Sequence, residues 1–412
     1  MKKKLCILFL AMTGIITLTG CHSGRQQEAK SSSEESHLVE LVVWGSEEDE
    51  ALLNQIIDNF ERRHQGEADF RITFQAQGES GCKDALLADL EAGADVFTFA
   101  DDQLNALAAA GALEPVPDGD TIRSENLAAS VEAASVRNTI YAYPLTSDNG
   151  YFMYYNKKYF SESDVKTLDR MLQIAEENHK FITMDWSSAW YVYAFFGNTG
   201  MEVGLNSDGI TNFCTWNQAE AKIRGIDVAQ AMAQIAESPG FASRTDTEFL
   251  SGVEEGTVIA GVSGVWNAVA MEEAWGEDFG AAKLPTYTCR DEQLQMASFS
   301  GCKLVGANAY SRNYDWACQL ASWIANEENQ KLRFELRGQG PSNIRASQSS
   351  AVQEAPAIAA LLEQSEFAQL QRIGGNFWDP VAVFAGTLAA GNPGHENLQD
   401  LLDQMVEGIT AR

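Results

Sequence analysis

One stretch of the chain, IYAYPLTSDNGYFMYYN at residues 140–156, places aromatic rings around a single carboxylate. The apolar and aromatic runs at 140–145 and 151–155 are typical of strands, and the polar residues 146–150 favour a turn or an irregular crossing. Aromatic side chains on both sides of Asp148 could hold a polar, ring-shaped ligand. Taken alone, however, the stretch is better described as an ordinary hairpin, with Asp148 as a turn residue.

Tryptophan is abundant, with nine in the chain. A polar, ring-shaped ligand offers C–H groups on its faces, which pack on aromatic rings for roughly 3 kcal/mol at most per ring, and hydroxyls at its edge, which bond to carboxylates and amides. Five tryptophans fall near predicted strand ends or helix starts: Trp44, Trp186, Trp190, Trp266 and Trp378. Taken one at a time, each of them is expected to pack in the core, and this stays the expectation for Trp44 and Trp186.

The elements that would position these side chains alternate between strands and helices in the first part of the chain. The predicted strands are 38–44, 72–76 and 95–100, and the predicted helices are 50–64, 86–90 and 104–110. Such an order implies an α/β fold with a parallel sheet covered by helices. Ligands bind at the carboxyl ends of the strands in such sheets. Three loops lie at such places: 45–49, 101–103 and 146–150.

The second part of the chain continues the same mixture. The predicted strands are 181–185, 257–262, 279–284 and 302–307, and the predicted helices are 164–177, 219–237, 314–326 and 328–336. The pattern is mostly helical from residue 355 onward. A length of 412 residues exceeds one ordinary core, so two lobes are expected.

Composition excludes some classes of partner. The formal net charge is −29 and the isoelectric point is near 4.5, which argues against DNA, RNA or anionic lipid headgroups as partners. After the N-terminus, no uncharged apolar run is long enough to span a bilayer.

The N-terminus has the features of a signal peptide at residues 1–20. A basic start precedes a short apolar run that ends in Leu18-Thr19-Gly20-Cys21. This ending resembles the bacterial lipobox, which implies cleavage before Cys21 and a lipid on its thiol. Residues 21–37 then form the lipidated cysteine and a polar, flexible tether.

Five cysteines remain in the rest of the chain: Cys82, Cys214, Cys289, Cys302 and Cys318. An odd set cannot pair completely within one chain, and no spacing is typical of a zinc site. We expect most of them to be buried, with Cys289 and Cys302 as the one pair worth testing for a disulfide. No cofactor and no metal are expected.

Several stretches together carry a family resemblance: LVVWGSEEDE (41–50), GADVFTFADDQLNALAAAGALEPV (93–116), YAYPLTSDNGYFMYYNKKYF (141–160), FLSGVEEGTVIAGVSGVWNA (249–268) and GGNFWDPV (374–381). In this order they resemble the extracellular solute-binding proteins of ABC importers, closest to the sugar-binding group that includes maltose-binding protein.

The resemblance implies a periplasmic-binding-protein-like α/β fold of two discontinuous lobes, joined by crossover segments, with the ligand in the cleft between them. The N-lobe would hold residues 38–147 plus 302–337, and the C-lobe 148–301 plus 338–412. Residues 145–150 are then the first crossing, with a hinge near Ser147 and Asp148 at the cleft floor. Ligand binding would favour the closed form.

The same resemblance implies ligand-binding residues. It gives Trp266 and Trp378 as aromatic platforms, Trp190 as a stacking ring, and Asp148, Asp101, Asp102 and Glu47 as polar contacts, while Phe99 stands where the maltose-binding relative has tryptophan. The family's acidic contact near Ser187 is not evident, and Asp185 could replace it. Two alternatives stay open: Asp148 could form an Asx turn, and Asp101 could cap the following helix.

The function implied is that of a monomeric, lipid-anchored receptor on the extracytoplasmic face of the cell membrane. It would capture an oligosaccharide, with a maltodextrin as the best single choice, and deliver it to ABC permease subunits. A lipid-anchored glycoside hydrolase is one alternative, although no GxSxG, HExxH or phosphate-loop motif is present. A binder of a non-sugar solute such as a polyamine is another.

Overall fold

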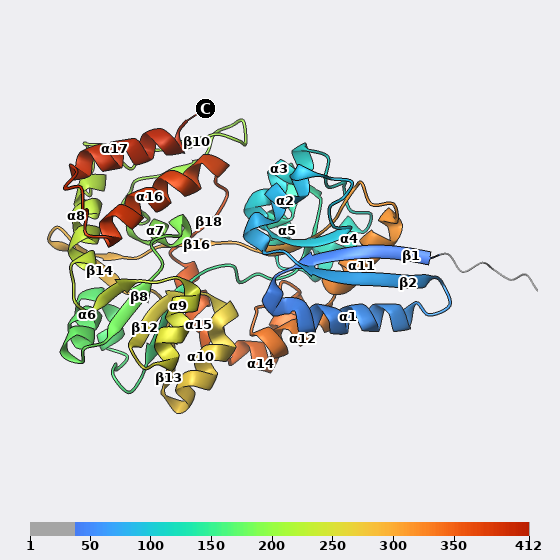
Figure 1. Cartoon of the computed structure of the whole chain (residues 1–412), viewed down its shortest axis with the longest axis horizontal. Helices are drawn as coiled ribbons and strands as arrows, with labels where there is room; N and C mark the ends of the chain where they lie inside the picture. Colours follow the sequence, from blue (N-terminus) through green and yellow to red (C-terminus); the bar gives the residue numbers. More distant parts are fainter. Residues whose placement is uncertain (1–37, 412) are drawn as a thin grey trace, which may run out of the picture. The chain divides into compact units, whose positions relative to one another are not determined.

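Two five-stranded sheets organise the chain in the computed structural model, which describes residues 38–411 (Figure 1). The first has the strand order β2-β1-β3-β17-β6, and the second has the order β11-β8-β12-β7-β13. The predicted α/β fold of two lobes is therefore confirmed. The signal peptide, Cys21 and the whole of the tether at 21–37 lie outside the described residues.

The sheet of the first lobe contains β1 (Leu38–Gly45), β2 (Asp69–Ala76), β3 (Val96–Ala100), β6 (Tyr143–Pro144) and β17 (Lys303–Ala307). The first three strands are parallel, and β17 runs antiparallel to both β3 and β6. The helices from these parts of the chain are α1 (Glu50–Arg63), α2 (Cys82–Ala88), α3 (Leu104–Ala109), α4 (Gly119–Glu125), α5 (Ala128–Ala133), α11 (Tyr314–Ile324) and α12 (Glu327–Arg337).

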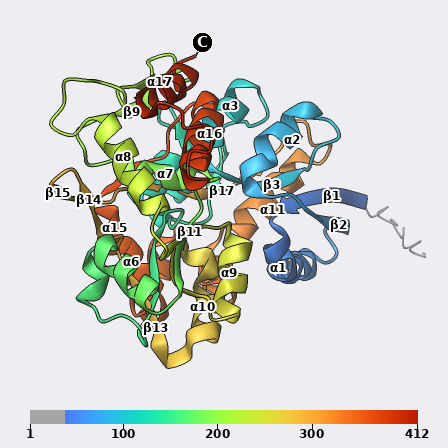
Figure 2. The same cartoon turned by 60° about the vertical axis from the view of Figure 1, so that its left-hand side comes forward.

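The sheet of the second lobe contains β7 (Phe152–Asn156), β8 (Phe181–Met184), β11 (Phe241–Ser243), β12 (Val258–Ser263) and β13 (Phe279–Ala282). The longer helices of this part are α6 (Leu168–Glu177), α7 (Ala189–Phe196), α8 (Gly225–Ala236), α9 (Asp246–Glu254), α10 (Ala268–Trp275), α15 (Pro356–Ser365), α16 (Trp378–Ala389) and α17 (Leu398–Ile409). Figure 2 shows α7 beside α8 and α16, with which it is in contact.

Short elements complete the fold. Three antiparallel pairs are β4 (Ser135–Val136) with β5 (Thr139–Ile140), β9 (Val203–Leu205) with β10 (Asn212–Cys214), and β14 (Thr286–Cys289) with β15 (Glu292–Gln295). A parallel pair joins β16 (Ser298–Ser300) to β18 (Ala368–Leu370). The short helices α13 (Ile344–Ser347) and α14 (Ser350–Gln353) follow α12. Among the described residues, no helix is long and apolar enough to cross a membrane.

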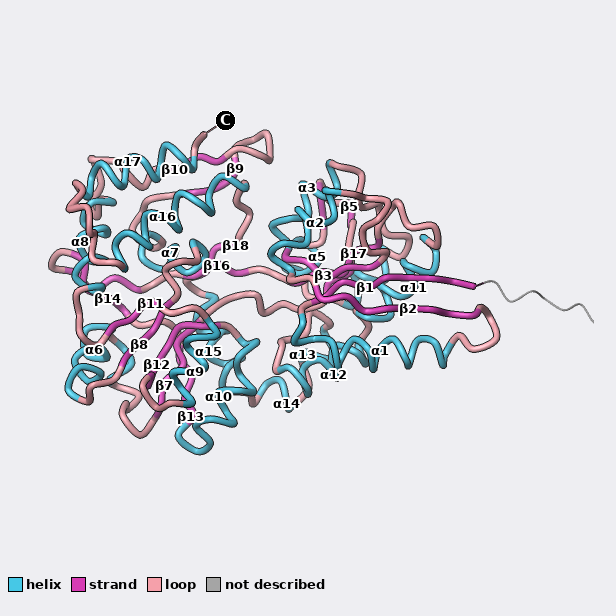
Figure 3. The backbone as a smooth tube through the Cα atoms, viewed as in Figure 1, coloured by secondary structure: helices cyan, strands magenta, loops and turns pink. Residues whose placement is uncertain are grey.

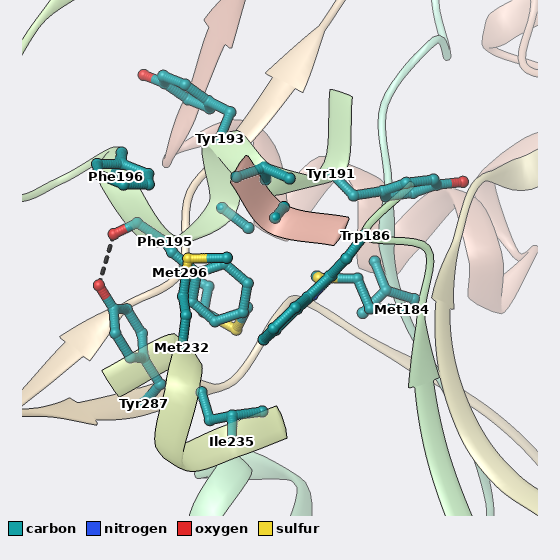
Figure 4. Packing of buried hydrophobic residues seen from close by; sticks show 14 of the residues in the cluster. Met184, Trp186, Tyr191, Tyr193, Phe195, Phe196, Met232, Ile235, Tyr287 and Met296 are labelled. Carbon is teal, nitrogen blue, oxygen red and sulfur yellow. Dashed lines mark hydrogen bonds between the residues drawn. The ribbon is translucent and has the colours of Figure 1, made fainter. Parts of the chain in front are cut away.

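The core of the second lobe surrounds α7, whose residues are almost all apolar or aromatic (Figure 4). Trp186 is fully buried just before this helix and packs edge-to-face on Phe195. The Tyr287 hydroxyl donates to the Phe195 carbonyl, which otherwise would lack a partner near the helix end. This packing fixes α7, and with it the direction of Trp190 on the helix.

The chain passes from one sheet to the other between β6 and β7, because β6 pairs with β17 in the first sheet and β7 with β12 in the second. Residues 145–151 are therefore a crossing and no hairpin. Two further crossings lie alongside, since the Ser147 amide donates to the Gly340 carbonyl at 3.0 Å and the Asn149 amide to the Gly301 carbonyl at 3.1 Å. Figure 3 shows these connections as loops.

Some expectations need correction. The helix expected at 219–237 begins only at Gly225, where Asp227 accepts from the Arg224 amide and side chain in a capping box. The mostly helical pattern after residue 355 includes the strand β18. The structure contradicts the candidate disulfide between Cys289 and Cys302. Both cysteines are unpaired, and they are buried in the cores of different lobes.

Candidate functional site

Two tryptophans from the second lobe lie close together. Trp190 is in the first turn of α7, and Trp266 follows the carboxyl end of β12. Their ring centres are 5.7 Å apart, with an angle of 36° between the rings, and both side chains are only partly buried. Tyr151 supports the pair, because its ring packs edge-on against Trp190 at 4.7 Å and its hydroxyl donates to the Trp190 carbonyl. The pair presents aromatic surface at the end of a sheet.

A carboxylate holds the Trp266 indole in place. Asp246, the first residue of α9, accepts from Trp266 Nε1 at 2.9 Å and from Ser263 Oγ at 2.8 Å. Burial raises the pKa of Asp246, although these two hydrogen bonds oppose the rise, and the nearby charge of Asp185 adds to it. The predicted residue Asp185 is thus close enough to act on this carboxylate, while its own oxygen accepts from the amide and hydroxyl of Ser187.

A buried glutamine links Trp190 to the first lobe. The Gln371 side chain accepts from Trp190 Nε1 at 2.7 Å and donates to Asp101 Oδ1 at 3.3 Å and Asp102 Oδ1 at 3.5 Å. Burial raises the pKa of Asp101 to about 6. Burial and the neighbouring Asp101 raise the pKa of Asp102 to about 8. Gln371, which the sequence did not single out, therefore brings together three predicted residues: Asp101 and Asp102 of the first lobe and Trp190 of the second.

One cation lies beside the aromatic pair. Lys303, the first residue of β17, has its Nζ 6.0 Å from the centre of the Trp266 ring and 3.4 Å from a Glu79 oxygen. Burial would lower the pKa of Lys303, but the charges of Glu79, Asp49 and Asp148 outweigh it and raise the pKa. Lys303 is therefore charged at neutral pH, and it offers hydrogen-bond donors beside an aromatic face.

Asp148 lies within the crossings, where it is 3% exposed. Its Oδ2 accepts from the Gly340 amide, and burial raises its pKa to about 6 against the opposing effects of Thr146 and Lys303. The residue is therefore neither on an exposed turn nor on the outer surface. Its observed partners are the Gly340 amide of another crossing and the Thr146 side chain.

The other predicted residues have separate surroundings. Trp378 is partly buried at the start of α16 and packs against Phe377 at 5.1 Å. Glu47 is exposed at the start of a short 3-10 helix, Glu47–Asp49, that follows β1. Phe99 is fully buried in the core of the first lobe, beside Phe97. Its ring is thus part of the packing beneath the sheet, and we leave it out of the candidate site.

Sequence reasoning missed Asp246, Gln371 and Lys303. Asp246 had a readable signal, since Thr245 and Glu248 form a capping box that marks a helix start after a strand. Gln371 follows a three-residue strand inside a segment with a helical pattern, and Lys303 stands at a predicted strand start with no special spacing. Their roles depend on partners far away in the sequence.

Two other features of the described residues bear on the chemistry. No group of three or more His, Cys, Asp or Glu side chains among them could hold a metal ion. A hollow of about 600 Å³ in the first lobe is lined by residues of α1, α11 and the loop 114–118. It contains none of the predicted ligand-binding residues, so it is distinct from the site described above.

The structure has two α/β lobes joined by three crossings, with aromatic and carboxylate side chains at strand ends. This arrangement is typical of extracellular solute-binding proteins. A family model for bacterial extracellular solute-binding proteins matches residues 55–360. The chain belongs to this family.

Individual relatives agree with this membership. The chain is 26% identical to the galactooligosaccharide-binding protein of Bacillus subtilis (strain 168) over 385 residues, 90% of this chain and 87% of the relative. It is 27% identical to the maltotriose-binding protein of Pyrococcus abyssi over 241 residues, 56% of this chain and 51% of the relative.

Solved structures are similar over nearly the whole chain. A structure with acarbose has a TM-score of 0.80 and 27% identity, covering 90% of this chain and 98% of the other. The ligand-free maltodextrin-binding protein of L. casei BL23 has a TM-score of 0.75 and 24% identity, covering 91% and 99%, and this second likeness concerns the fold alone.

Proposed function

We propose that this protein is the carbohydrate-binding component of an ABC importer, which captures an oligosaccharide between its lobes and delivers it to the permease. Family membership supports a solute-binding role. The names of two relatives, a galactooligosaccharide-binding and a maltotriose-binding protein, support an oligosaccharide as the ligand. A maltodextrin is the first choice for testing, and galactooligosaccharides are the second.

The observation that carries this proposal is the Trp190–Trp266 pair with its carboxylates. The two rings are partly exposed and 5.7 Å apart, so they can pack on the C–H faces of sugar rings. Asp246, Asp101 and Asp102 lie around them and can accept from hydroxyls at the sugar edge. Trp378, Asp148, Glu47 and Asp185 are the further contacts that we propose on the basis of the family resemblance.

The charge of Lys303 favours a neutral sugar over a polyamine. A polyamine would have to place its ammonium groups near aromatic faces and carboxylates. Lys303 already lies beside Trp266 and is paired with Glu79. A second cation at this place would meet like-charge repulsion in a partly desolvated site.

Capture would require the lobes to move about the crossings. We propose an N-lobe of 38–147 plus 302–337 and a C-lobe of 148–301 plus 338–412, with a hinge near Ser147. The backbone bonds from Ser147 to Gly340 and from Asn149 to Gly301 support a hinge here, because they hold the three crossings together while each lobe keeps its own sheet.

We further propose that a lipid on Cys21 anchors the protein at the extracytoplasmic face of the membrane.

Isothermal titration calorimetry with maltodextrins, galactooligosaccharides and spermidine tests the ligand class. We expect heat with at least one oligosaccharide and a loss of at least about tenfold in affinity for Trp266→Ala. Trp316→Ala is the matched control, since Trp316 is a partly buried tryptophan of α11 that packs on Phe60 and Phe70. Absence of heat with every saccharide would overturn the assignment.

A turnover assay separates a binding protein from a glycoside hydrolase. The purified protein would be incubated with the saccharide that gives the largest heat, and reducing ends would be measured over a day. We expect no release above that of buffer. Release that depends on Asp101 or Asp246 would identify an enzyme and contradict the proposal.

A further inference from the structure

One buried carboxamide joins three of the candidate ligand-binding residues. Gln371 is 3% exposed, and it accepts from Trp190 Nε1 while donating toward Asp101 and Asp102. The carboxamide is the group that can do this, because its oxygen accepts from an indole N–H while its nitrogen donates to carboxylates. A single side chain thus sets the distance between an aromatic ring of one lobe and a carboxylate pair of the other.

The backbone around Gln371 fixes this arrangement. The Gln371 amide donates to the Ser300 carbonyl at 2.9 Å, which extends the β16–β18 pairing into the second crossing. Gly301 follows Ser300, and a Cβ there would lie 2.5 Å from Asp101 Oδ1 and 3.2 Å from the Gln371 side chain. Glycine therefore permits the carboxylate and the carboxamide to meet at the crossing.

One oxygen of Asp101 has no hydrogen-bond partner. Asp101 is 4% exposed, and its Oδ1 accepts from the Cys302 amide at 3.0 Å as well as from Gln371. Its Oδ2 is buried without a donor within the described residues. An unpaired carboxylate oxygen in a buried place is costly, so the site is incomplete until a donor reaches it.

We propose that Gln371 is a positioning residue of the binding site, which holds Trp190 against the Asp101–Asp102 pair and leaves Asp101 Oδ2 free to accept from a ligand hydroxyl. The proposal rests on the proposed function, because it gives the sugar both its stacking ring and its acceptor through one side chain. It also assigns the site a requirement for a hydroxyl at the edge of the sugar ring that packs on Trp190.

The charges around Asp101 make this arrangement sensitive to pH. Asp102 lies next to it, the Arg372 guanidinium and the Cys302 backbone amide act on it from the crossings, and Lys83 acts on Asp102 from α2. The charge of Asp101 in turn raises the pKa of the Cys302 thiol. Burial raises the pKa of Asp101 to about 6, and the Gln371 hydrogen bond is one of the effects that oppose this rise. Loss of Gln371 therefore raises the pKa of Asp101. On acidification, the accepting carboxylate is then protonated at a higher pH than in the wild type.

Two glutamines of the same segment provide a matched pair of variants. Gln371→Met removes the carboxamide that contacts the carboxylates. Gln369→Met removes a carboxamide whose partners, the Tyr193 hydroxyl and the Val203 carbonyl, lie within the second lobe. Saccharide affinity would be measured by calorimetry from pH 5 to pH 9 for the wild type and both variants.

We expect Gln371→Met to weaken saccharide binding about tenfold or more at neutral pH. We also expect this variant to lose affinity at a higher pH than the wild type when the solution is acidified. Gln369→Met should change neither the affinity nor its pH dependence. Gln371→Glu is the conservative variant, and its protonated carboxyl can replace the carboxamide. Its affinity should approach that of the wild type at pH 5 and fall steeply as the new glutamate ionises beside Asp101. Equal effects of Gln371→Met and Gln369→Met, or unchanged pH profiles, would overturn the proposal.

A ligand-free measurement separates this inference from the proposed function. The Trp190 indole N–H resonance, assigned by comparison with Trp190→Phe, would be followed by NMR across the same pH range. We expect it to titrate with Asp101 in the wild type and to lose this response in Gln371→Met. A resonance that never responds to pH would contradict the role of Gln371 even if the protein binds sugar. If the resonance responds to pH but the protein binds no saccharide, the role of Gln371 in holding Trp190 stands. That result would contradict the proposed function and the proposed hydrogen bond from a ligand hydroxyl to Asp101.

Discussion

Arg333 and Asp49 form an ion pair in which each residue is 1% exposed. Arg337 Nε adds a second contact, 2.9 Å from Asp49 Oδ1. The pair joins α12 to the residue just before α1, so it links parts of the chain that are 284 residues apart. Burial opposes the charge on Asp49, but the charges of Arg333, Lys303 and Arg337 hold its pKa below the ordinary value.

Breaking this pair should destabilise the first lobe. Asp49→Ala leaves the Arg333 guanidinium buried without its charged partner, with only the Gln339 side chain to accept from it, so we expect a loss of about 3–5 kcal/mol in the free energy of unfolding. Urea denaturation monitored by circular dichroism measures it. The control is Glu40→Ala, because Glu40 pairs with Arg71 where both are more than half exposed, and we expect less than about 1 kcal/mol there. Equal losses would contradict the stabilising role of the buried pair.

The same pair predicts sensitivity to acid. Because the pKa of Asp49 is lower in the folded protein than in the unfolded chain, its stabilisation is present above the unfolded value and is lost as pH falls through the folded value. We expect the difference in stability between wild type and Asp49→Ala to be constant near neutral pH and to shrink in strong acid. A difference that grows on acidification would be the contrary result.

Asp102 should make the stability of the protein depend on pH in the direction opposite to that of Asp49. Its pKa is raised to about 8, so between the unfolded value and pH 8 the folded protein binds more protons at this site than the unfolded chain does. Stability therefore falls as pH rises through this range. Asp102→Asn should gain stability at pH 8.5, on the order of 1 kcal/mol after allowance for its partial exposure, and little at pH 4. Thermal scans at the two pH values, with Asp84→Asn on exposed surface as the control, test this expectation.

Phe99 should matter for stability and not for affinity. Its ring is fully buried in the first-lobe core, so Phe99→Ala should cost about 3–5 kcal/mol in the free energy of unfolding. Phe99→Leu, which keeps most of the volume, should fold with saccharide affinity close to that of the wild type. Calorimetry on this milder variant is the check, and a tenfold loss of affinity without loss of stability would restore Phe99 to the site.

Substitution of Asp148 tests whether this residue of the crossings acts in lobe closure or in ligand binding. Its carboxylate accepts from the Gly340 amide of another crossing, so Asp148→Ala should weaken saccharide binding by about 1–3 kcal/mol. Asp148→Asn keeps an acceptor for that amide and should retain more affinity. Small-angle scattering with and without saccharide measures closure directly. If Asp148→Ala closes as the wild type does and binds equally well, Asp148 is neither a hinge residue nor a ligand contact.

Local patterns predicted much of the fold. The spacing of Leu52, Ile56 and Phe60 predicted α1, and all three are buried. The apolar run at 95–100 predicted β3, which occupies the centre of the first sheet. The pairs β9–β10 and β14–β15 were missed because their strands have only three or four residues, too few for an alternating pattern to be recognised.

The candidate site was predicted only in part. Trp190 and Trp266 are neighbours, as a shared binding site requires, and their positions after strands were readable. Phe99 was chosen by its place in a family motif, and its burial depends on the sheet that covers it. Gln371 gave no signal, because its three partners lie 181, 270 and 269 residues away.

The sequence by itself determined the alternation of strands and helices, the membership of a solute-binding family and the chemical types of the site residues. These properties depend on local periodicity and on motifs in a fixed order. Only the tertiary structure decided which strands the crossing at 145–151 joins, that Asp148 contacts Gly340, and that Gln371 joins Trp190 to Asp101. Such contacts depend on how distant segments pack, because hydrogen bonds and burial are set by neighbours in space that no local pattern specifies.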